Sequence, residues 1–294
     1  MKRFFFTALC ILAIAQYTSA QNKPAYQLFK NNGKKAKYDK MIKDLAQGDM
    51  VFFGEYHTNP IAHWLQLEMC KSFYEVKGDA LFLGAEMFEN GNQLVIDEYL
   101  QGFYREDKLT PEITQLWGNF QTDYKPLLDF AKEKQLRFIA TNIPRRYASM
   151  IYKMGIDALT KLSPDALEMI GPDLEKHFDP TAKAYAEMAE KMGGHVPKNM
   201  LNMQLSQASK DATMAHFILL NVEDGKLLLH FNGAYHSDDF ESINYMLKRK
   251  NPSLKIVTIS NVKQDDVSEI EEENLGKADF ILAVPSSMTR TRTQ

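Results

Sequence analysis

Two tetrapeptides of the same form end in histidine: Gly54-Glu55-Tyr56-His57 and Gly233-Ala234-Tyr235-His236. Each follows a short hydrophobic run typical of a buried strand, residues 50–53 in the first case and residues 227–231 in the second. If the two strands are parallel neighbours, both histidines leave the same edge of one sheet, which is where open α/β sheets bind their ligands. The pair therefore predicts a functional site at that carboxyl edge.

Other predicted strands add polar side chains at this edge. The second run along the chain is followed by Glu86, and the third by Asn142 and Arg145. The helix expected after the first tetrapeptide carries His63 and Gln66, which share a face because they are three residues apart. The candidate site thus combines imidazoles, carboxylates, an amide and a guanidinium.

This combination suggests two kinds of chemistry. Imidazoles and carboxylates are ligands for Mn, Co or Zn, and the candidate metal set is Glu55, His57, Glu86 and His236. A metal with an open position would activate water, with Glu55 or Glu86 as the general base. The same groups also serve as hydrogen-bonding partners in a site without a metal. The chain has no Gly-x-Ser-x-Gly, Walker or Gly-x-Gly-x-x-Gly motif, which argues against serine hydrolases, nucleotide hydrolases and dinucleotide-binding proteins.

Six strand-like runs alternate with segments that carry helix-start signals. The runs are residues 50–54, 80–84, 136–141, 226–233, 254–260 and 280–284. Capping residues precede proline at Asn59-Pro60, Thr110-Pro111, Ser163-Pro164 and Asp179-Pro180, and Asp238 with Glu241 has the spacing of a capping box. The alternation predicts an α/β fold, a mostly parallel open sheet flanked by helices.

The alternation stops between residues 145 and 219, where the sequence is helical and rich in methionine. We expect one α/β domain over residues 21–294, with a helical insertion at about 145–219 that forms a smaller lid subdomain. Methionine lines adaptable apolar surfaces, so the insertion favours a large apolar ligand nearby. Residues 21–38 and 286–294 are expected to be loose.

Residues 1–20 have the charged, apolar and small-residue regions of a secretory signal peptide, which predicts export to the periplasm or cell envelope. Removing Lys2 and Arg3 changes the formal charge from -3 to -5 (-3 - 2), and no dense basic run follows, so we expect no nucleic-acid partner. Cys70 is then the only cysteine. It predicts a buried thiol and no intramolecular disulfide.

The motifs occur in one order along almost the whole mature chain. They are Phe53-Gly54-Glu55-Tyr56-His57-Thr58-Asn59-Pro60 with His63 and Gln66, Glu86-Met87-Phe88 with Gln93, Tyr124-Lys125-Pro126-Leu127-Leu128, Asn142-Ile143-Pro144-Arg145, Asp211-Ala212-Thr213-Met214-Ala215 and Gly233-Ala234-Tyr235-His236. In this order the chain resembles the ChaN-type haem-binding proteins, in the superfamily that also holds the Tiki and TraB proteins.

The resemblance implies a parallel α/β core with a smaller helical part, residence in the cell envelope, and a role in iron or haem acquisition or storage. It also implies haem held between two subunits, a homodimer, by tyrosine and histidine contacts, with envelope transport components as further partners. The candidate haem contacts are Tyr56, His57, His63, Tyr124, Asn142, Arg145, Tyr235 and His236. The chain departs from the haem group in lacking a usable lipoprotein cysteine, because Cys10 lies inside the apolar region, and membrane attachment therefore stays open.

Two alternatives remain open at this point. Tiki-type relatives are similar to metal-dependent proteases, so a divalent-metal hydrolase is the alternative to a haem-binding protein. The tyrosine that would contact iron is also undecided among Tyr56, Tyr124, Tyr147, Tyr152, Tyr185 and Tyr235. Arg145 or Arg146 suits the carboxylates of haem, because a guanidinium binds carboxylates in bidentate fashion.

Overall fold

The computed structural model describes residues 23–172, 174, 178–188 and 199–292. The predicted signal peptide therefore lies outside the described residues. Strands of the described part are β1 (Gln27–Lys30), β2 (Met50–Glu55), β3 (Leu81–Glu89), β4 (Phe138–Asn142), β5 (Leu227–Gly233), β6 (Ile256–Gln264) and β7 (Phe280–Pro285). Helices are α1 (Tyr38–Leu45), α2 (Pro60–Lys77), α3 (Gln93–Leu100), α4 (Glu106–Glu112), α5 (Lys125–Glu133), α6 (Arg145–Met154), α7 (Pro164–Leu167), α9 (Lys183–Ala186), α11 (Met200–Leu219) and α12 (Ile243–Lys250).

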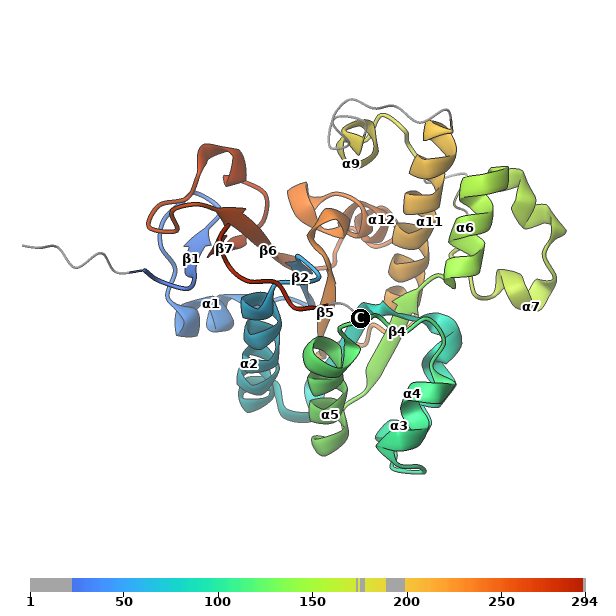
Figure 1. Cartoon of the computed structure of the whole chain (residues 1–294), viewed down its shortest axis with the longest axis horizontal. Helices are drawn as coiled ribbons and strands as arrows, with labels where there is room; N and C mark the ends of the chain where they lie inside the picture. The colour runs from blue at the N-terminus through green and yellow to red at the C-terminus, as the bar shows by residue number, and fades with distance from the viewer. Residues whose placement is uncertain (1–22, 173, 175–177, 189–198, 293–294) are drawn as a thin grey trace, which may run out of the picture.

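The strands form a single sheet in the order β1-β7-β6-β2-β5-β3-β4 (Figure 1). All neighbouring pairs are parallel except β1 and β7, which are antiparallel. The prediction of a mostly parallel open α/β sheet is confirmed. Strand β5 lies between β2 and β3, so the ends of all three strands meet at one edge.

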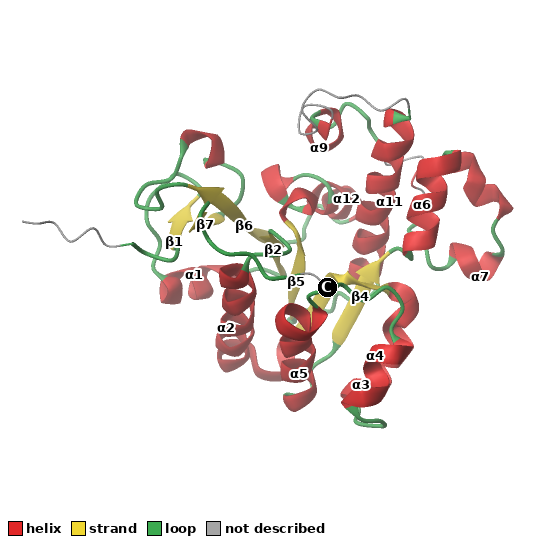
Figure 2. Ribbon diagram, viewed as in Figure 1, coloured by secondary structure: helices red, strands yellow, loops and turns green. Residues whose placement is uncertain are grey.

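Helices cover both faces of the sheet (Figure 2). Successive residues of β2 alternate between the two layers: Val51 and Phe53 belong to the hydrophobic core under α1, α2 and α5, whereas Met50 and Phe52 belong to the core under α11 and α12. Side chains of a strand point alternately to its two faces, so burial on both faces requires a continuously apolar strand. This explains why the strand runs are recognisable in the sequence.

The described parts of residues 145–219 contain helices and connecting segments and no strand. Within them α11 packs against α6, α12 and the edge strand β4. This is the helical character expected for the insertion, and its role as a lid stays a prediction. Among the described residues, none of the helices has the length and apolar character needed to span a bilayer.

Within the described residues, both terminal segments are more ordered than the sequence suggested. Residues 27–30 form β1, with Leu28 and Phe29 buried, although this region was expected to be loose. After β7, the backbone N–H of Thr291 donates to the carbonyl oxygen of Thr58 at 2.9 Å, so the last described residues run back to the loop after β2. A four-residue edge strand has too few residues for its pattern to be recognised, and the contact at Thr58 joins residues far apart in the chain.

Two of the four proline signals mark helix starts, since α2 begins at Pro60 and α7 at Pro164. The other two predictions were wrong. Pro111 lies inside α4, and the carboxylate of Asp179 instead accepts hydrogen bonds from Thr181 in a turn. The capping box was also wrong: α12 starts at Ile243, and the Glu241 carboxylate accepts the backbone N–H of Ala184 at 2.6 Å.

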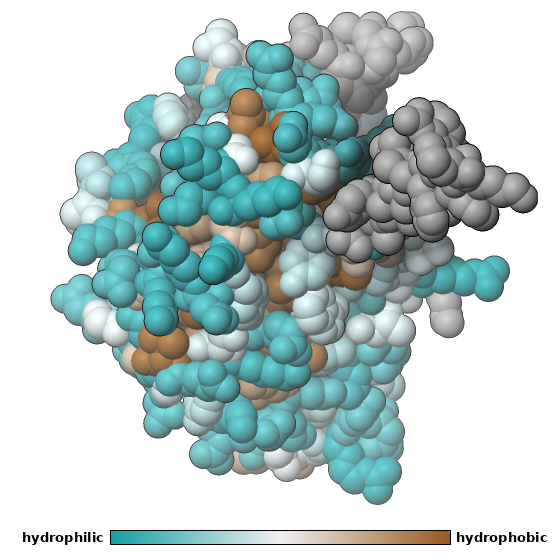
Figure 3. Space-filling view, turned by 90° about the vertical axis from the view of Figure 1, so that its left-hand side faces the viewer, coloured by the Kyte–Doolittle hydropathy of each residue, from teal (hydrophilic) through white to brown (hydrophobic). Residues whose placement is uncertain are grey.

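The face of the molecule at the β1 edge is mostly hydrophilic, and its hydrophobic side chains form small, separate patches (Figure 3). Isolated hydrophobic residues of this kind are normal on the surface of a globular protein. The polar groups of interest lie elsewhere, at the carboxyl edge of the sheet.

Gly54 lets the end of β2 approach the segment after β5. A Cβ at this position would lie 2.8 Å from the Cα of Ala234 and 3.0 Å from Oγ of Ser237. We expect Gly54→Ala to lower the free energy of unfolding by about 1–3 kcal/mol, because backbone must move to admit the methyl group. Urea unfolding measures this, with Gly91→Ala as control, since its nearest atom is Met169 Sδ at 3.8 Å. Equal stability of the two variants would contradict the prediction.

Candidate functional site

A cavity of about 820 Å³ opens at the carboxyl edge of β2, β3, β4 and β5. Eight of the ten predicted site residues line it: Glu55, Tyr56, His57, Glu86, Asn142, Arg145, Tyr235 and His236. The other two, His63 and Tyr124, are buried and lie behind this lining. The structure thus brings together side chains from four strand ends, and separates those that face the cavity from those that support its wall.

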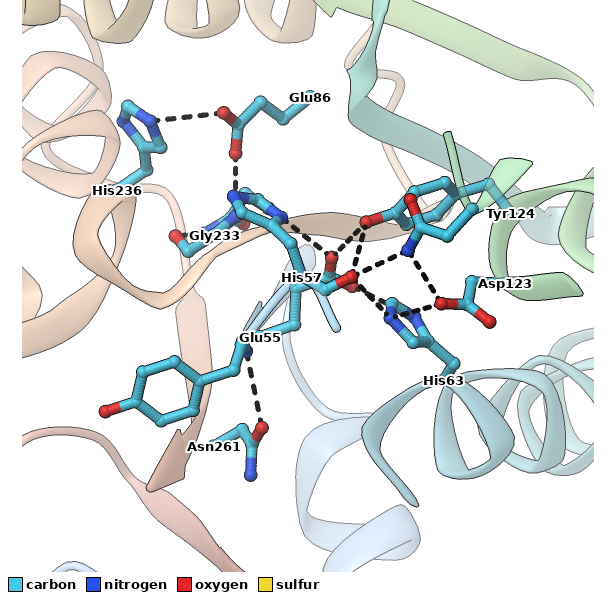
Figure 4. A network of polar contacts seen from close by, with 12 residues as sticks. Glu55, His57, His63, Glu86, Asp123, Tyr124, Gly233, His236 and Asn261 are labelled. Carbon is cyan, nitrogen blue, oxygen red and sulfur yellow. Dashed lines mark hydrogen bonds and ion pairs between the residues drawn. The ribbon is translucent and has the colours of Figure 1, made fainter. Parts of the chain in front are cut away.

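His57 is held by the buried carboxylate of Glu55 (Figure 4). Nδ1 of His57 lies 3.0 Å from Oε1 of Glu55. Glu55 in turn accepts the hydroxyl of Tyr124 at 2.8 Å and the amide of Gln66 at 2.5 Å. With Nδ1 directed at a carboxylate, the other ring nitrogen, Nε2, is turned away from Glu55, and among the described residues it has no hydrogen-bond partner.

The loop carrying His57 is fixed through its main chain as well. The carbonyl oxygen of His57 accepts the side-chain amide of Asn119 at 2.7 Å, and it lies 3.1 Å from Nε2 of His63 and 3.4 Å from the Tyr124 hydroxyl (Figure 4). Nε2 of His63 is also 3.2 Å from the Asp123 carboxylate. His63 therefore supports the site from behind. Asn119 and Asp123 were not recognised from the sequence, because they lie in a segment without a strand or helix signal.

The ring of His57 is confined on two sides. On one side it contacts the indole of Trp117, with ring centroids 4.4 Å apart. On another it lies against Gly233, where a Cβ would be only 2.8 Å from Nε2. Burial alone would lower the pKa of His57, but the hydrogen bond to Glu55 and the charge of Glu86 outweigh it and raise the pKa above 6.5. His57 is therefore a positioned imidazole with raised basicity.

Glu86 and His236 form the second imidazole–carboxylate pair. Glu86 lies within β3, near an irregularity in the pairing with β4, rather than after the strand as the sequence suggested. Its Oε2 accepts the backbone N–H of Gly233 at 2.7 Å, and its Oε1 lies 3.3 Å from Nε2 of His236. The opposite nitrogen of His236 lies 2.6 Å from the carboxylate of Asp211 on α11, which also accepts the hydroxyl of Tyr185 at 2.8 Å.

The charges of this group stabilise one another. Burial alone would lower the pKa of His236, but the carboxylates of Glu86 and Asp211 raise it to about 10. Burial would likewise raise the pKa of Glu86, but His236, His57 and the Gly233 N–H hold it well below its usual range. His236 is therefore an imidazolium clamped between two carboxylates. Asp211 belongs to a motif noticed in the sequence, but nothing in its spacing assigned it to the site.

Three candidate tyrosines differ in the hydrogen-bond partners and the exposure of their side chains. Burial and the Glu55 carboxylate raise the pKa of Tyr124 well above 10, and its hydroxyl is committed to Glu55. The hydroxyl of Tyr235 donates to the carbonyl oxygen of Ala184 at 2.5 Å. Tyr56 is 40% exposed at the cavity wall, and the ammonium of Lys263 lies 4.0 Å above its ring. Of these three, Tyr56 is the most accessible.

The wall formed by α6 and α11 was only partly predicted. Asn142 and Arg145 line it, and the backbone N–H of Arg145 donates to Glu89 at 2.9 Å. Lys210 and Gln207 of α11 also line it, and no motif or spacing in the sequence had selected them. This wall contributes two cationic side chains to the cavity.

The four candidate metal ligands all line the cavity, but they are arranged as two separate imidazole–carboxylate pairs. Among the described residues, no group of three or more His, Cys, Asp or Glu side chains is placed to hold a metal ion. The Mn, Co or Zn site stays a hypothesis, whose direct test is elemental analysis of protein purified without chelator.

Comparison with known structures supports the fold. The chain is similar to ChaN of Campylobacter jejuni, described by its cofacial haem binding, with a TM-score of 0.63 and 18% identity over 87% of this chain and 96% of that one. It is also similar to a Bacillus cereus protein, with a TM-score of 0.52 and 12% identity over 92% and 97% of the two chains. A succinoglycan biosynthesis protein has a TM-score of 0.51 and 11% identity over 89% and 94%. At these identities the likeness shows the fold alone.

No curated protein sequence matches the chain significantly. A protein-family profile does: it is described as haem-binding uptake, Tiki superfamily, ChaN, and it matches residues 41–247. This range includes both tetrapeptides, Glu86 and Asp211, and it covers more than half of the 294 residues. The chain therefore belongs to the ChaN family of the Tiki superfamily.

Proposed function

We propose that this protein binds haem in the cavity at the carboxyl edge, and that it serves iron or haem acquisition or storage in the cell envelope. One observation carries the proposal: His57 lines the cavity while its Nδ1 is held by the buried Glu55 carboxylate. Metal-binding histidines characteristically have such a partner on the nitrogen that does not bind the metal. Nε2 of His57 is thus the donor that we assign to the iron.

The rest of the cavity suits the same ligand. Its volume of about 820 Å³ lies in the range of small-molecule and cofactor sites, roughly 300–1,000 Å³. Met87, Leu116, Trp117 and Ile143 supply hydrophobic lining for a porphyrin ring. Arg145 and Lys210 line the same cavity and would pair with the haem carboxylates.

The tyrosine contact and the second subunit belong to the same proposal. Tyr56 is the tyrosine we favour, because it lines the cavity and is partly exposed, whereas the hydroxyls of Tyr124 and Tyr235 have intramolecular acceptors. A second copy of the chain would close the cavity on the exposed side of Tyr56.

We expect the purified mature protein to bind haemin at micromolar concentration, with a shift of the haem absorption band and a defined stoichiometry. His57→Ala should weaken binding by about 10–100-fold or more and change the spectrum, because it removes the assigned donor. Gly233→Ala should have a smaller effect in the same direction, since its Cβ would displace the His57 ring. Titration followed by visible spectroscopy measures all three.

The control for this titration is Gly91→Ala, where a Cβ makes only an ordinary contact. The proposal fails if haemin stays unbound at micromolar concentration. It fails in its choice of iron ligand if His57→Ala binds with the affinity and spectrum of the unchanged protein.

A further inference from the structure

We infer that Trp117 is the residue through which the cavity recognises a flat ring, so that the cavity binds the porphyrin macrocycle whether or not the macrocycle carries iron. The inference rests on the proposed haem binding. It adds a class of ligand, planar macrocyclic dicarboxylates without a metal, that needs no bond between His57 and iron. The evidence is the way in which the chain holds Trp117 at the cavity wall.

The indole is carried by a short segment, residues 115–118, that is fixed at both ends. Before it, the side chain of Asn92 accepts the backbone N–H of Thr114 at 3.1 Å and donates to the carbonyl oxygen of the same residue at 3.2 Å. After it, the side-chain amide of Asn119 donates to the carbonyl oxygen of His57 at 2.7 Å. All four residues between these two anchors line the cavity.

The backbone on either side of Trp117 has unusual conformations. Gln115 is exposed and has a φ of 58°, in the left-handed region that residues with a side chain rarely adopt. On the other side, Phe120–Tyr124 form a π-helix. Strained backbone persists only where the surrounding structure imposes it, and π-helical turns occur frequently at functional sites. The position of Trp117 is therefore imposed by the chain around it.

Trp117 lies beside the candidate iron donor and is only partly buried. Its ring centroid is 4.4 Å from that of His57, with the planes tilted by 55°, and 6.0 Å from that of Tyr124, nearly edge-on at 78°. Among the described residues, none accepts a hydrogen bond from the indole N–H. Buried tryptophans usually have such a partner. Trp117 is therefore an aromatic wall of the cavity that is partly open, and not a closed core residue.

Different residues of the cavity meet different features of a porphyrin. The iron is assigned to Nε2 of His57, and the two carboxylates would pair with Arg145 and Lys210, which line the same cavity. Trp117 is left for the macrocycle, because stacking on an indole needs a flat partner. Stacking does not depend on a metal. Removal of the iron thus removes the contact with His57 and leaves the contact with Trp117.

The test titrates the mature protein with haemin, with metal-free protoporphyrin IX and with biliverdin, an open-chain tetrapyrrole that has the same two carboxylates but no flat ring. Absorbance follows haemin and biliverdin, and porphyrin emission follows protoporphyrin. We expect protoporphyrin to bind at micromolar concentration and more weakly than haemin. Biliverdin should bind about 3–10-fold more weakly than protoporphyrin, because it cannot stack along a whole ring.

Trp117→Leu removes the flat ring and keeps an apolar side chain. It should weaken the binding of haemin and of protoporphyrin by the same factor, about 3–10-fold, and the advantage of protoporphyrin over biliverdin should disappear. Trp117→Phe, which restores a flat ring, should recover most of the lost affinity. His57→Ala has a different signature: it should weaken haemin by about 10–100-fold and protoporphyrin by a smaller factor, because only haemin offers iron.

The matched control is Trp64→Leu. Trp64 is the other tryptophan of the chain, it is 48% exposed on α2 with its ring tilted by 55° against Tyr26, and it does not line the cavity. This variant should bind all three ligands as the wild type does. Circular dichroism shows whether each variant is folded. If Trp117→Leu does not fold, the comparison of protoporphyrin with biliverdin in the unchanged protein decides the question.

The inference is overturned if protoporphyrin stays unbound at micromolar concentration, if biliverdin binds as tightly as protoporphyrin, or if folded Trp117→Leu binds protoporphyrin with the wild-type affinity. When His57→Ala weakens haemin as expected and Trp117→Leu leaves protoporphyrin binding unchanged, the role of Trp117 is refuted and the proposed haem binding stands. When protoporphyrin binds through Trp117 and haemin binding does not depend on His57, the choice of iron ligand fails and the recognition of the flat ring stands.

Discussion

Replacing His236 with alanine is expected to lower the free energy of unfolding by about 3–5 kcal/mol. The imidazole lies 2.6 Å from Asp211 and 3.3 Å from Glu86, and all three side chains are buried. Its removal leaves two carboxylates facing each other without a counter-charge. The loss of packing around one ring is a smaller effect than the desolvation of those charges. Urea unfolding at pH 6 to 7 measures the difference.

His216→Ala is the control, because His216 is a partly buried residue of the same helix as Asp211 and has no carboxylate contact among the described residues. Its effect should stay within about 0.5 kcal/mol. Adding Asp211→Asn to His236→Ala should restore part of the lost stability, since it removes one of the two unpaired charges. If His236→Ala lowers the free energy of unfolding by less than 1 kcal/mol, the contacts of His236 with Asp211 and Glu86 are not important for stability.

The second large effect is a loss of stability at alkaline pH. The pKa of His236 is raised from 6.5 to about 10, so the folded protein keeps a proton that the unfolded chain releases. The resulting stabilisation is fully present below pH 6.5 and is lost as the pH rises through 10. Between pH 6 and pH 9 the expected loss from this residue is on the order of 2–3 kcal/mol.

Glu86 has the opposite dependence. Its pKa lies well below 4.5, so its contribution is present above pH 4.5 and is lost as the pH falls. The pair is therefore most stabilising between about pH 4.5 and 6.5. Urea unfolding at pH 6 and pH 9 compares the wild type with His236→Gln, which should lose most of the pH dependence between these values. If the wild type and His236→Gln lose the same stability between pH 6 and pH 9, the loss at alkaline pH comes from groups other than His236.

The two tetrapeptides were sufficient to locate the site, because each ends a continuously apolar run that is buried on both faces. This location depended on the condition that the two runs are parallel neighbours, and the structure meets it, with Glu55 in register with Gly233. Nothing in the sequence states that β5, rather than β3, lies beside β2, or that β3 continues past Glu86. Strand order and register depend on which distant segments pair.

The residues that support the two histidines could not be assigned to the site from the sequence, for the same reason. Asp211 and Tyr185 belong to the helical segment, where neither the period of the helix nor the spacing of polar residues distinguishes an inward carboxylate from a solvated one. Trp117, which covers one side of the His57 ring, lies in a connection without regular structure. Each was identifiable only from its contact with a residue far away in the chain.

The amino-acid sequence by itself therefore determined the class of fold, the edge at which the site lies and most of the side chains that face the cavity. These follow from local patterns, since a buried strand must be apolar and a polar group directly after it must lie at the sheet edge. Only the tertiary structure decided what those groups do. One ring nitrogen of His57 faces a carboxylate, whereas both ring nitrogens of His236 do. The two tetrapeptides look alike because their strands end alike, and their histidines differ because burial and neighbouring charge come from residues that the local sequence does not contain.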